Sequence, residues 1–370
     1  MPFSVVCRHC NEKTRSDEWR WRHECGGTLD ILFDLRGKHF SHLIDEGEQN
    51  LRRYAQLLPL QSLPTIHQGW TPIAKRSING VEVNFKLEYL STGGSFKDRG
   101  AYVSVARAKE QGAKGIIVDS SGNAGIGFSL MGLLSGVDVS VFIPKHAPEG
   151  KKKLLRLLKA TVREIEGDRM HVNRAALAAE QAGFVYVGHW WNPYFIEGVK
   201  TIAYEAYEQV GSVDFVVAPV GSGTMLLGLH KGYAELQELG AVNRMPSFIA
   251  VQACGYSTIC EDLGGKPPAA PSSKLADGIA IADPPRRCQI ADAVRKTGGS
   301  CAVVGDEETR QALVELIELG FVVEPTSATA YAALRQYAKA GHIKSGARVL
   351  LPLTGSGLKL VDELLALTTR

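Results

Sequence analysis

The chain has 370 residues, of which 45% are hydrophobic and 22% charged, a composition typical of globular proteins. Its net charge of +3 is too small to predict binding to nucleic acid or to a membrane surface. No stretch reaches the roughly 20 apolar residues of a transmembrane helix, and Cys7 and Cys10 stand where an export signal would carry its apolar core. The seven cysteines form no disulfide-like pattern, so we expect a cytoplasmic protein.

The predicted elements change character along the chain. Residues 1–30 are rich in Cys, His, Arg and Trp and lack long apolar runs. A helix is predicted over residues 43–58, ended by prolines. From residue 81 onward, runs rich in Val, Ile and Phe alternate with stretches of helical spacing, which predicts an α/β fold with mostly parallel strands. The expected strands are 83–90, 115–119, 137–143, 162–166, 184–187, 215–219, 248–251 and 348–353.

The first junction of interest is residues 91–100, which follows a predicted strand and opens a predicted helix. Ligands of parallel α/β sheets bind at such junctions, beyond the carboxyl ends of the strands. Lys97 lies in the first helical turn, where the positive end of the helix dipole destabilises an ammonium. An amine nucleophile needs such placement. An exposed lysine at a helix start is the alternative interpretation.

A second junction follows the strand at 115–119 and reads Ser120, Ser121, Gly122, Asn123 and Ala124. Its hydroxyls, amide side chain and free helix amides suit a carboxylate or a phenolate oxygen. An ordinary helix N-cap is the alternative.

A third junction, Gly221, Ser222, Gly223 and Thr224, combines backbone amides and two hydroxyls at a helix start, as a phosphate site does. It has neither the lysine of a P-loop nor the GxGxxG spacing of a dinucleotide site. A tight glycine turn is the alternative. Thr354 follows the last predicted strand in the same manner.

Segment 94–100 resembles the Schiff-base motif of the threonine synthase branch of fold-type II (tryptophan synthase beta-like) pyridoxal 5'-phosphate (PLP) enzymes. Segments 51–59, 192–201, 324–328 and 353–359 resemble further motifs of that branch, so the resemblance covers nearly the whole chain. It implies two three-layer αβα domains with mostly parallel sheets and a small N-terminal zinc-ribbon-like segment.

The resemblance also implies domain limits. Residues 1–30 would form a degenerate zinc-ribbon-like segment. Residues 31–90 and 200–370 would form the larger, PLP-binding domain. Residues 91–199 would form the smaller domain, which binds the substrate carboxylate and carries the Schiff-base lysine at its edge.

Carried over residue by residue, the resemblance implies these roles. Lys97 would hold PLP as a Schiff base and later move the Cα proton of the substrate. Asn123 would bond the phenolic oxygen of PLP, and residues 120–124 would hold the substrate carboxylate. Residues 221–224 would bind the cofactor phosphate. Thr354 would meet the pyridine nitrogen with a hydroxyl, which favours elimination and replacement over transamination.

The sequence departs from the threonine synthase pattern in the motif with which that branch binds a substrate phosphate. The serine and arginine of the family motif are replaced by Trp190 and Phe195, and the threonine that usually follows Asn123 is Ala124. Phenylalanine cannot make the paired, charge-assisted hydrogen bonds that an arginine makes with a phosphate. O-phosphohomoserine is therefore not the expected substrate. Trp190 and Trp191 line either an aromatic site or the core, and His189 is either an acid–base group or structural.

The N-terminal Cys7, Cys10 and Cys25 resemble the start of the zinc ribbon found in some threonine synthases. A complete ribbon needs four ligands, and Arg22 stands where the fourth cysteine is expected. His23 is close to Cys25 in sequence, and His9 is another candidate. Two interpretations stay open, a zinc site and a degenerate ribbon kept only as packing.

The leading hypothesis is therefore a PLP-dependent carbon–oxygen lyase of the threonine synthase-like group, which eliminates or replaces a group at the β or γ carbon of a small amino acid. Segment 275–280 resembles threonine and serine dehydratases, which gives the first alternative. A true threonine synthase and a non-catalytic PLP-binding homologue are the others. The resemblance implies a homodimer. The sequence does not fix the amino acid or its leaving group.

Overall fold

The computed structural model describes residues 1–167, 169–180, 183–266, 268 and 270–368. The chain divides into two compact units, each built from two separate stretches. Unit 1 comprises Met1–Trp70 and Lys97–Thr201, and unit 2 comprises Thr71–Phe96 and Ile202–Arg370. The domain limits expected from the sequence remain a prediction.

Unit 1 begins with a small antiparallel sheet of order β2-β1-β3, formed by β1 (Phe3–Cys7), β2 (Lys13–Thr14) and β3 (Leu29–Phe33). Two short 3-10 helices, Phe40–His42 and Leu51–Leu57, follow it. The single helix expected over residues 43–58 is therefore wrong. Tyr54 is non-helical, and the side chain of Asn50 accepts a hydrogen bond from the N–H of Arg52, so the second segment starts afresh at Asn50.

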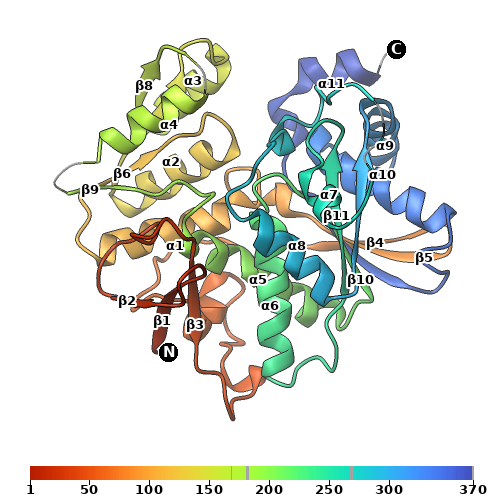
Figure 1. Cartoon of the computed structure of the whole chain (residues 1–370), viewed down its shortest axis with the longest axis horizontal. Helices are drawn as coiled ribbons and strands as arrows, with labels where there is room; N and C mark the ends of the chain where they lie inside the picture. The colour runs from red at the N-terminus through yellow and green to blue at the C-terminus, as the bar shows by residue number, and fades with distance from the viewer. Residues whose placement is uncertain (168, 181–182, 267, 269, 369–370) are drawn as a thin grey trace. The chain divides into compact units, whose positions relative to one another are not determined.

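The larger sheet of unit 1 has four parallel strands in the order β8-β7-β6-β9. Alternating side chains cover its two faces. Ile117 and Phe142 pack with α4 residues on one face, whereas Val139 and Val141 meet glycines of α2 on the other. The strands are β6 (Gly115–Val118), β7 (Asp138–Pro144), β8 (Thr161–Ile165) and β9 (Phe184–Tyr186). The helices are α1 (Lys97–Glu110), α2 (Asn123–Ser135), α3 (Glu149–Leu157) and α4 (Arg169–Ala178) (Figure 1).

Unit 2 has a six-stranded sheet of order β12-β11-β10-β13-β5-β4, parallel except for the edge strand β4. Ile249 faces a core shared with α9 and α10, and the adjacent Phe248 contacts His230 and Tyr233 of α6, so helices cover both faces. The strands are β4 (Ile73–Ile78), β5 (Val81–Lys86), β10 (Phe215–Pro219), β11 (Ser247–Ala253), β12 (Ser300–Val304) and β13 (Arg348–Pro352).

The helices that belong to unit 2 alone are α6 (Thr224–Glu238), α7 (Thr258–Asp262), α8 (Arg287–Lys296), α9 (Asp306–Glu318), α10 (Pro325–Lys339) and α11 (Val361–Thr368). Short 3-10 turns lie at Glu88–Leu90, Asp277–Ile279 and Gly357–Lys359. Helix α5 (Pro193–Val210) runs from unit 1 into unit 2. The two parallel-rich sheets confirm the predicted α/β class with mostly parallel strands.

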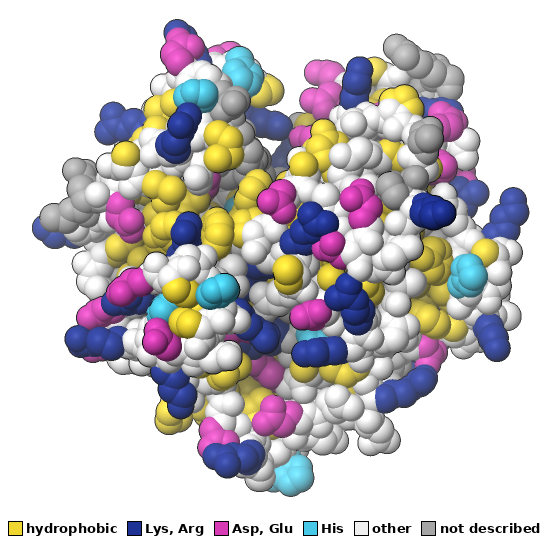
Figure 2. Space-filling model, viewed as in Figure 1, with side chains coloured by type: hydrophobic (Ala, Val, Ile, Leu, Met, Phe, Trp, Pro, Cys, Tyr) yellow, Lys and Arg dark blue, Asp and Glu magenta, His cyan; other side chains and the backbone are white. Residues whose placement is uncertain are grey.

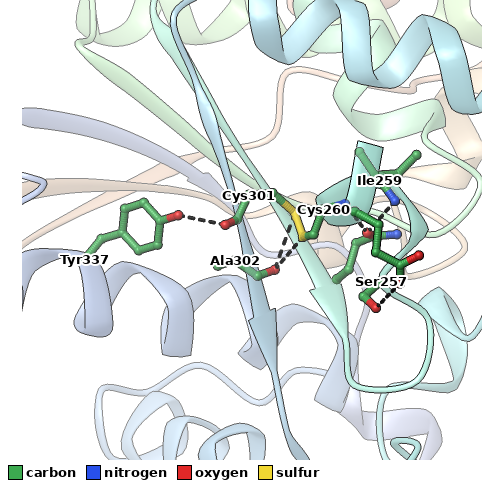
Figure 3. Close-up of a disulfide and its surroundings, with 8 residues drawn as sticks. Ser257, Ile259, Cys260, Cys301, Ala302 and Tyr337 are labelled. Atoms are coloured by element: carbon green, nitrogen blue, oxygen red, sulfur yellow. Dashed lines mark hydrogen bonds between the residues drawn. A yellow bond between two sulfur atoms is a disulfide. The ribbon is translucent and has the colours of Figure 1, made fainter. Parts of the chain in front are cut away.

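One feature was not expected from the cysteine pattern. Cys260 of α7 and Cys301 of β12 form a disulfide across 41 residues (Figure 3). The hydroxyl of Tyr337 donates to the carbonyl of Cys301 at 2.9 Å, so α10 also fixes this strand. Cys7, Cys10, Cys25, Cys254 and Cys288 are free.

On the face shown in Figure 2, acidic and basic side chains are interspersed. This agrees with the small net charge. Among the helices that the structure describes, none combines the length and the apolar character that crossing a membrane requires.

Candidate active site

The backbone that leads into Lys97 is held firmly by the last strand-to-loop junction of unit 2. The N–H of Phe96 donates to the carbonyl of Thr354 at 3.0 Å, and the N–H of Ser356 donates to the carbonyl of Gly94 at 2.9 Å. Gly94 has φ +78°, a left-handed conformation that favours glycine. Lys97 is the first residue of α1 and follows Phe96 directly along the chain.

Within unit 1, an apolar aromatic ring lies beside the Lys97 side chain. Its Nζ lies 5.6 Å from the centroid of Phe195, which is fully buried. A Cβ on Gly100 would lie 2.5 Å from this ring, so glycine at position 100 makes room for Phe195. His189 and Phe128 also contact the ring, at centroid distances of 5.5 and 5.8 Å. The surroundings of the Lys97 amine on this side are therefore aromatic rather than cationic.

The predicted carboxylate loop forms one tight strand-to-helix turn. Residues 120–123 are half-buried, whereas Ala124 is buried, and Asn123 begins α2. A Cβ on Gly125 would lie 1.9 Å from the carbonyl oxygen of Ser120, so the loop folds back on the first turn of the helix. This turn brings the predicted substrate-binding residues together at a helix N-terminus, which suits a carboxylate.

The third junction forms a compact glycine cradle between β10 and α6. Gly223 has φ +80°, and a Cβ there would lie 2.2 Å from Ile290. A Cβ on Gly221 would lie 2.7 Å from the Cα of Ile279, which places segment 275–280 against the loop. The buried hydroxyls of Ser222 and Thr224 are 3.3 Å apart. Amides and hydroxyls at a helix N-terminus fit the oxygens of a phosphate group.

Ser327 orients Thr354. The two hydroxyl oxygens are 2.9 Å apart, and the N–H of Thr354 donates to Ser327 Oγ at 2.9 Å. Ser327 lies in the first turn of α10, within segment 324–328, yet nothing in the sequence indicated this contact across 27 residues. Ser95 and Thr354 are also buried, and among the described residues no partner is found for Ser95 Oγ. A buried hydroxyl without a protein partner is suited to a bound polar group.

The N-terminal cysteines form a complete four-ligand cluster with a histidine. Ligand atoms of Cys7, Cys10, His23 and Cys25 all lie within 4.8 Å of one another. The Sγ atoms of Cys7 and Cys10 are 3.5 and 3.7 Å from that of Cys25, and His23 Nδ1 is 3.0 Å from Cys25 Sγ. A tetrahedral zinc site with Zn–S bonds of about 2.3 Å places its sulfurs about 3.8 Å apart. The cluster therefore fits zinc.

His23 was only one of two candidates for the fourth ligand. His9 instead donates its backbone N–H to Cys7 Sγ at 3.4 Å, and it is not part of the cluster. A Cβ on Gly27 would lie 2.6 Å from the same sulfur, so this glycine gives the cluster its space. The fourth ligand, His23, lies one residue after the position where a second CxxC motif would put a cysteine.

Comparison with known proteins finds relatives over most of the chain. A family profile described as "Pyridoxal-phosphate dependent enzyme" matches residues 64–355. Threonine synthase from Methanosarcina acetivorans is 30% identical over 96% of this chain and 92% of its own length. Threonine synthase from Methanocaldococcus jannaschii is 29% identical over 96% and 93%.

Solved structures share the fold. Maize serine racemase superposes with a TM-score of 0.67 at 22% identity, and 80% of this chain and 91% of that chain are covered. O-acetylserine-dependent cystathionine beta-synthase from Helicobacter pylori gives 0.66 at 21%, with 80% and 95% covered. At these identities the likeness supports the fold alone.

Proposed function

Because this chain belongs to the family of pyridoxal-phosphate dependent enzymes and is threonine synthase-like, we propose that it eliminates or replaces a group at the β or γ carbon of a small amino acid without a phosphate. The observation that carries this proposal is Phe195, which is buried beside the Lys97 amine where the resemblance puts a phosphate-gripping arginine. A neutral ring cannot neutralise a phosphate dianion.

The residues of the chain fit the cofactor. The cradle at 221–224 offers amides and hydroxyls for its phosphate, and Lys97 supplies the amine that would hold it. When bound, PLP supplies an electron sink for the charge that develops at the substrate Cα. Thr354, oriented by Ser327, would meet the ring nitrogen with a neutral hydroxyl. A neutral partner keeps this sink mild, which favours loss of a leaving group over transamination.

The remaining roles concern the substrate. The turn at 120–124 would bind its carboxylate, and Asn123 would fix the phenolic oxygen of the cofactor through its side-chain amide. Lys97 Nζ would take the proton from the substrate Cα and return it later.

Two other enzyme activities remain as candidates. Segment 275–280, which resembles hydroxy-amino acid dehydratases, lies against the cradle at Gly221, and this favours threonine or serine dehydration as the second candidate. A true threonine synthase would need another group in place of the missing arginine.

The test is the visible absorption of the purified protein, followed during addition of O-phosphohomoserine, threonine, serine, O-phosphoserine, O-acetylserine and diaminopropionate. We expect a lysine-bound cofactor band that Lys97→Ala removes, and product from an amino acid without a phosphate. Turnover of O-phosphohomoserine would contradict the interpretation of Phe195. Absence of any cofactor band from the wild-type protein reconstituted with PLP would contradict the proposal as a whole.

A further inference from the structure

The segment between the second and third ligands of the cysteine–histidine cluster carries unusual aromatic contacts. We call residues 15–22 the aromatic arm. It ends directly before His23, and Cys10 lies upstream of it beyond β2, so a metal held by the cluster would hold the chain on both sides of the arm. Within the arm, Trp19 and Trp21 are half-buried although no strand or helix includes them. The ring contacts of both side chains are with residues of unit 1.

Both tryptophans contact Tyr186, the last residue of β9. Trp19 Nε1 donates to the Tyr186 carbonyl at 2.9 Å, and Trp21 meets the Tyr186 ring edge-on with centroids 5.0 Å apart. Tyr186 is 2% exposed, and its hydroxyl donates to Asp119 Oδ1 at 3.0 Å. Asp119 directly precedes Ser120, the first residue of the predicted carboxylate turn. The arm is thus connected to that turn through one tyrosine.

The arm also contacts the loop that departs from the threonine synthase pattern. Trp21 lies edge-on to Trp191 at 6.2 Å, and the Arg22 guanidinium lies 5.1 Å from the same ring. Trp19 stacks on Tyr194 at 5.2 Å, one residue before Phe195. The same short arm therefore contacts the loop at Trp191 and Tyr194 directly and reaches the predicted carboxylate turn through Tyr186.

Helix α1, which begins at Lys97, fixes the start of the arm. The side chain of Arg107 donates to the Ser16 carbonyl, and Gln111 Nε2 donates to it at 3.1 Å. These bonds and the pairing of β2 with β1 fix the start of the arm, and a metal in the cluster would fix its end at His23.

We propose that Trp19 and Trp21 are positioning residues for the amino-acid site and that zinc in the Cys7–Cys10–His23–Cys25 cluster holds them there. Loss of the metal frees the arm, loosens Tyr186 and Trp191, and weakens substrate binding without releasing PLP. This inference rests on the proposed function for its kinetic readout only. Its structural readouts do not depend on which amino acid reacts.

The test uses the full-length holoenzyme in three forms, which are wild type, Cys10→Ser and Trp21→Leu, with Trp70→Leu as a matched control. Trp70 is another half-buried tryptophan of unit 1, packed against Arg53 and not part of the arm. We measure zinc content, hydrogen–deuterium exchange of residues 184–192, tryptophan fluorescence and the cofactor band. Where the amino-acid panel yields a substrate, KM and kcat are measured as well.

We expect wild type to hold one zinc and Cys10→Ser to lose it, with amide exchange in 184–192 faster by about tenfold because the segment opens locally more often. Trp21→Leu should keep zinc but show the same exchange. Both variants should keep the cofactor band. Their KM should rise by about tenfold while kcat stays within about twofold, because the variants lose binding of the substrate rather than stabilisation of the transition state. Trp70→Leu should match wild type in exchange and KM.

Wild-type protein supplied with zinc during expression and still free of it would overturn the inference. So would unchanged exchange in 184–192 after zinc loss. If Cys10→Ser misfolds, chelation of the wild-type holoenzyme followed by readdition of zinc answers the same question. If no amino acid on the panel reacts, the proposed substrate class fails, while the exchange and fluorescence results still decide this inference.

Discussion

At the scale of single residues, contacts between distant parts of the chain hold the candidate site residues in place. Glycine-rich turns after strands carry a local signal, so Lys97, the turn at 120–124 and the cradle at 221–224 could be singled out. Ser327 could not, because its contact with Thr354 joins residues far apart in the chain. Whether His23 is the fourth ligand could not be decided from the sequence, because the CxxC spacing expects a cysteine one position earlier. Only the fold of the loop brings its imidazole to the three sulfurs.

The close fit of Gly100 and Phe195 gives a stability prediction. Gly100→Ala puts a Cβ 2.5 Å from a buried ring that packs against Phe128 and His189, so the ring has little room to move. We expect a loss of roughly 1–3 kcal/mol in the free energy of unfolding, typical of overpacking. Urea unfolding measures it. Gly150→Ala, in a helix with nothing near the new methyl, is the control and should be neutral or stabilising. Equal midpoints for both variants would contradict the tight contact.

The bond between Ser327 and Thr354 gives a second prediction. Ser327→Ala leaves the buried N–H of Thr354 without its acceptor, at a cost of roughly 1–3 kcal/mol. The freed Thr354 hydroxyl should also shift the absorption maximum of the bound cofactor, which a purely structural serine would not do. The neighbouring Thr329→Ser, which keeps a hydroxyl for the Thr326 carbonyl, is the control and should leave the spectrum unchanged.

At the scale of elements, strand and helix alternation was readable because buried parallel strands are continuous apolar runs. The helix predicted over 43–58 was wrong because apolar spacing does not reveal a helix cap inside the run. Asn50 is such a cap, and a separate 3-10 helix begins after it. The disulfide could not be predicted from the sequence, for a different reason. Cys260 and Cys301 come together only through the pairing of β11 with β12.

A buried ion pair joins β5 to α5. Lys86 and Glu205 are both fully buried, with Nζ and Oε2 2.7 Å apart, and Lys86 also donates to Gln209 at 3.0 Å. Lys86→Met removes the cation that pairs with the buried Glu205 carboxylate, so we expect a loss of about 3–5 kcal/mol in the free energy of unfolding. Adding Glu205→Gln should recover part of it, because the second change removes the charge. A double variant less stable than the single one in urea unfolding would refute this account.

The disulfide gives a prediction of its own. A bridge across 41 residues restricts the unfolded chain, so Cys260→Ser should lower the free energy of unfolding by about 2–4 kcal/mol under oxidising conditions. The exposed, unpaired Cys288→Ser is the control and should have no effect. With a reducing agent present, wild type and Cys260→Ser should unfold at closely similar urea concentrations. A difference that persists after reduction would mean that the serine acts through packing instead.

At the scale of the whole molecule, motif resemblance and alternation were enough to predict the fold class, because the order of strands along the chain restricts parallel topologies to few solutions. The strand order of unit 2 could not be predicted from the sequence. Its sheet inserts β13, the last strand, between β5 and β10, and pairings so distant leave no local trace in the sequence.

That insertion sets the order in which the chain can assemble during synthesis. The four-stranded sheet of unit 1 comes from one stretch, residues 115–186, and can form while later residues are still being translated. The sheet of unit 2 stays in two pieces, β4 with β5 and β10 to β12, until β13 leaves the ribosome and joins them. A ribosome stalled before residue 348 would therefore hold a chain in which the sheet behind the cradle at 221–224 is unfinished, with the exposed edges of β5 and β10 available to chaperones.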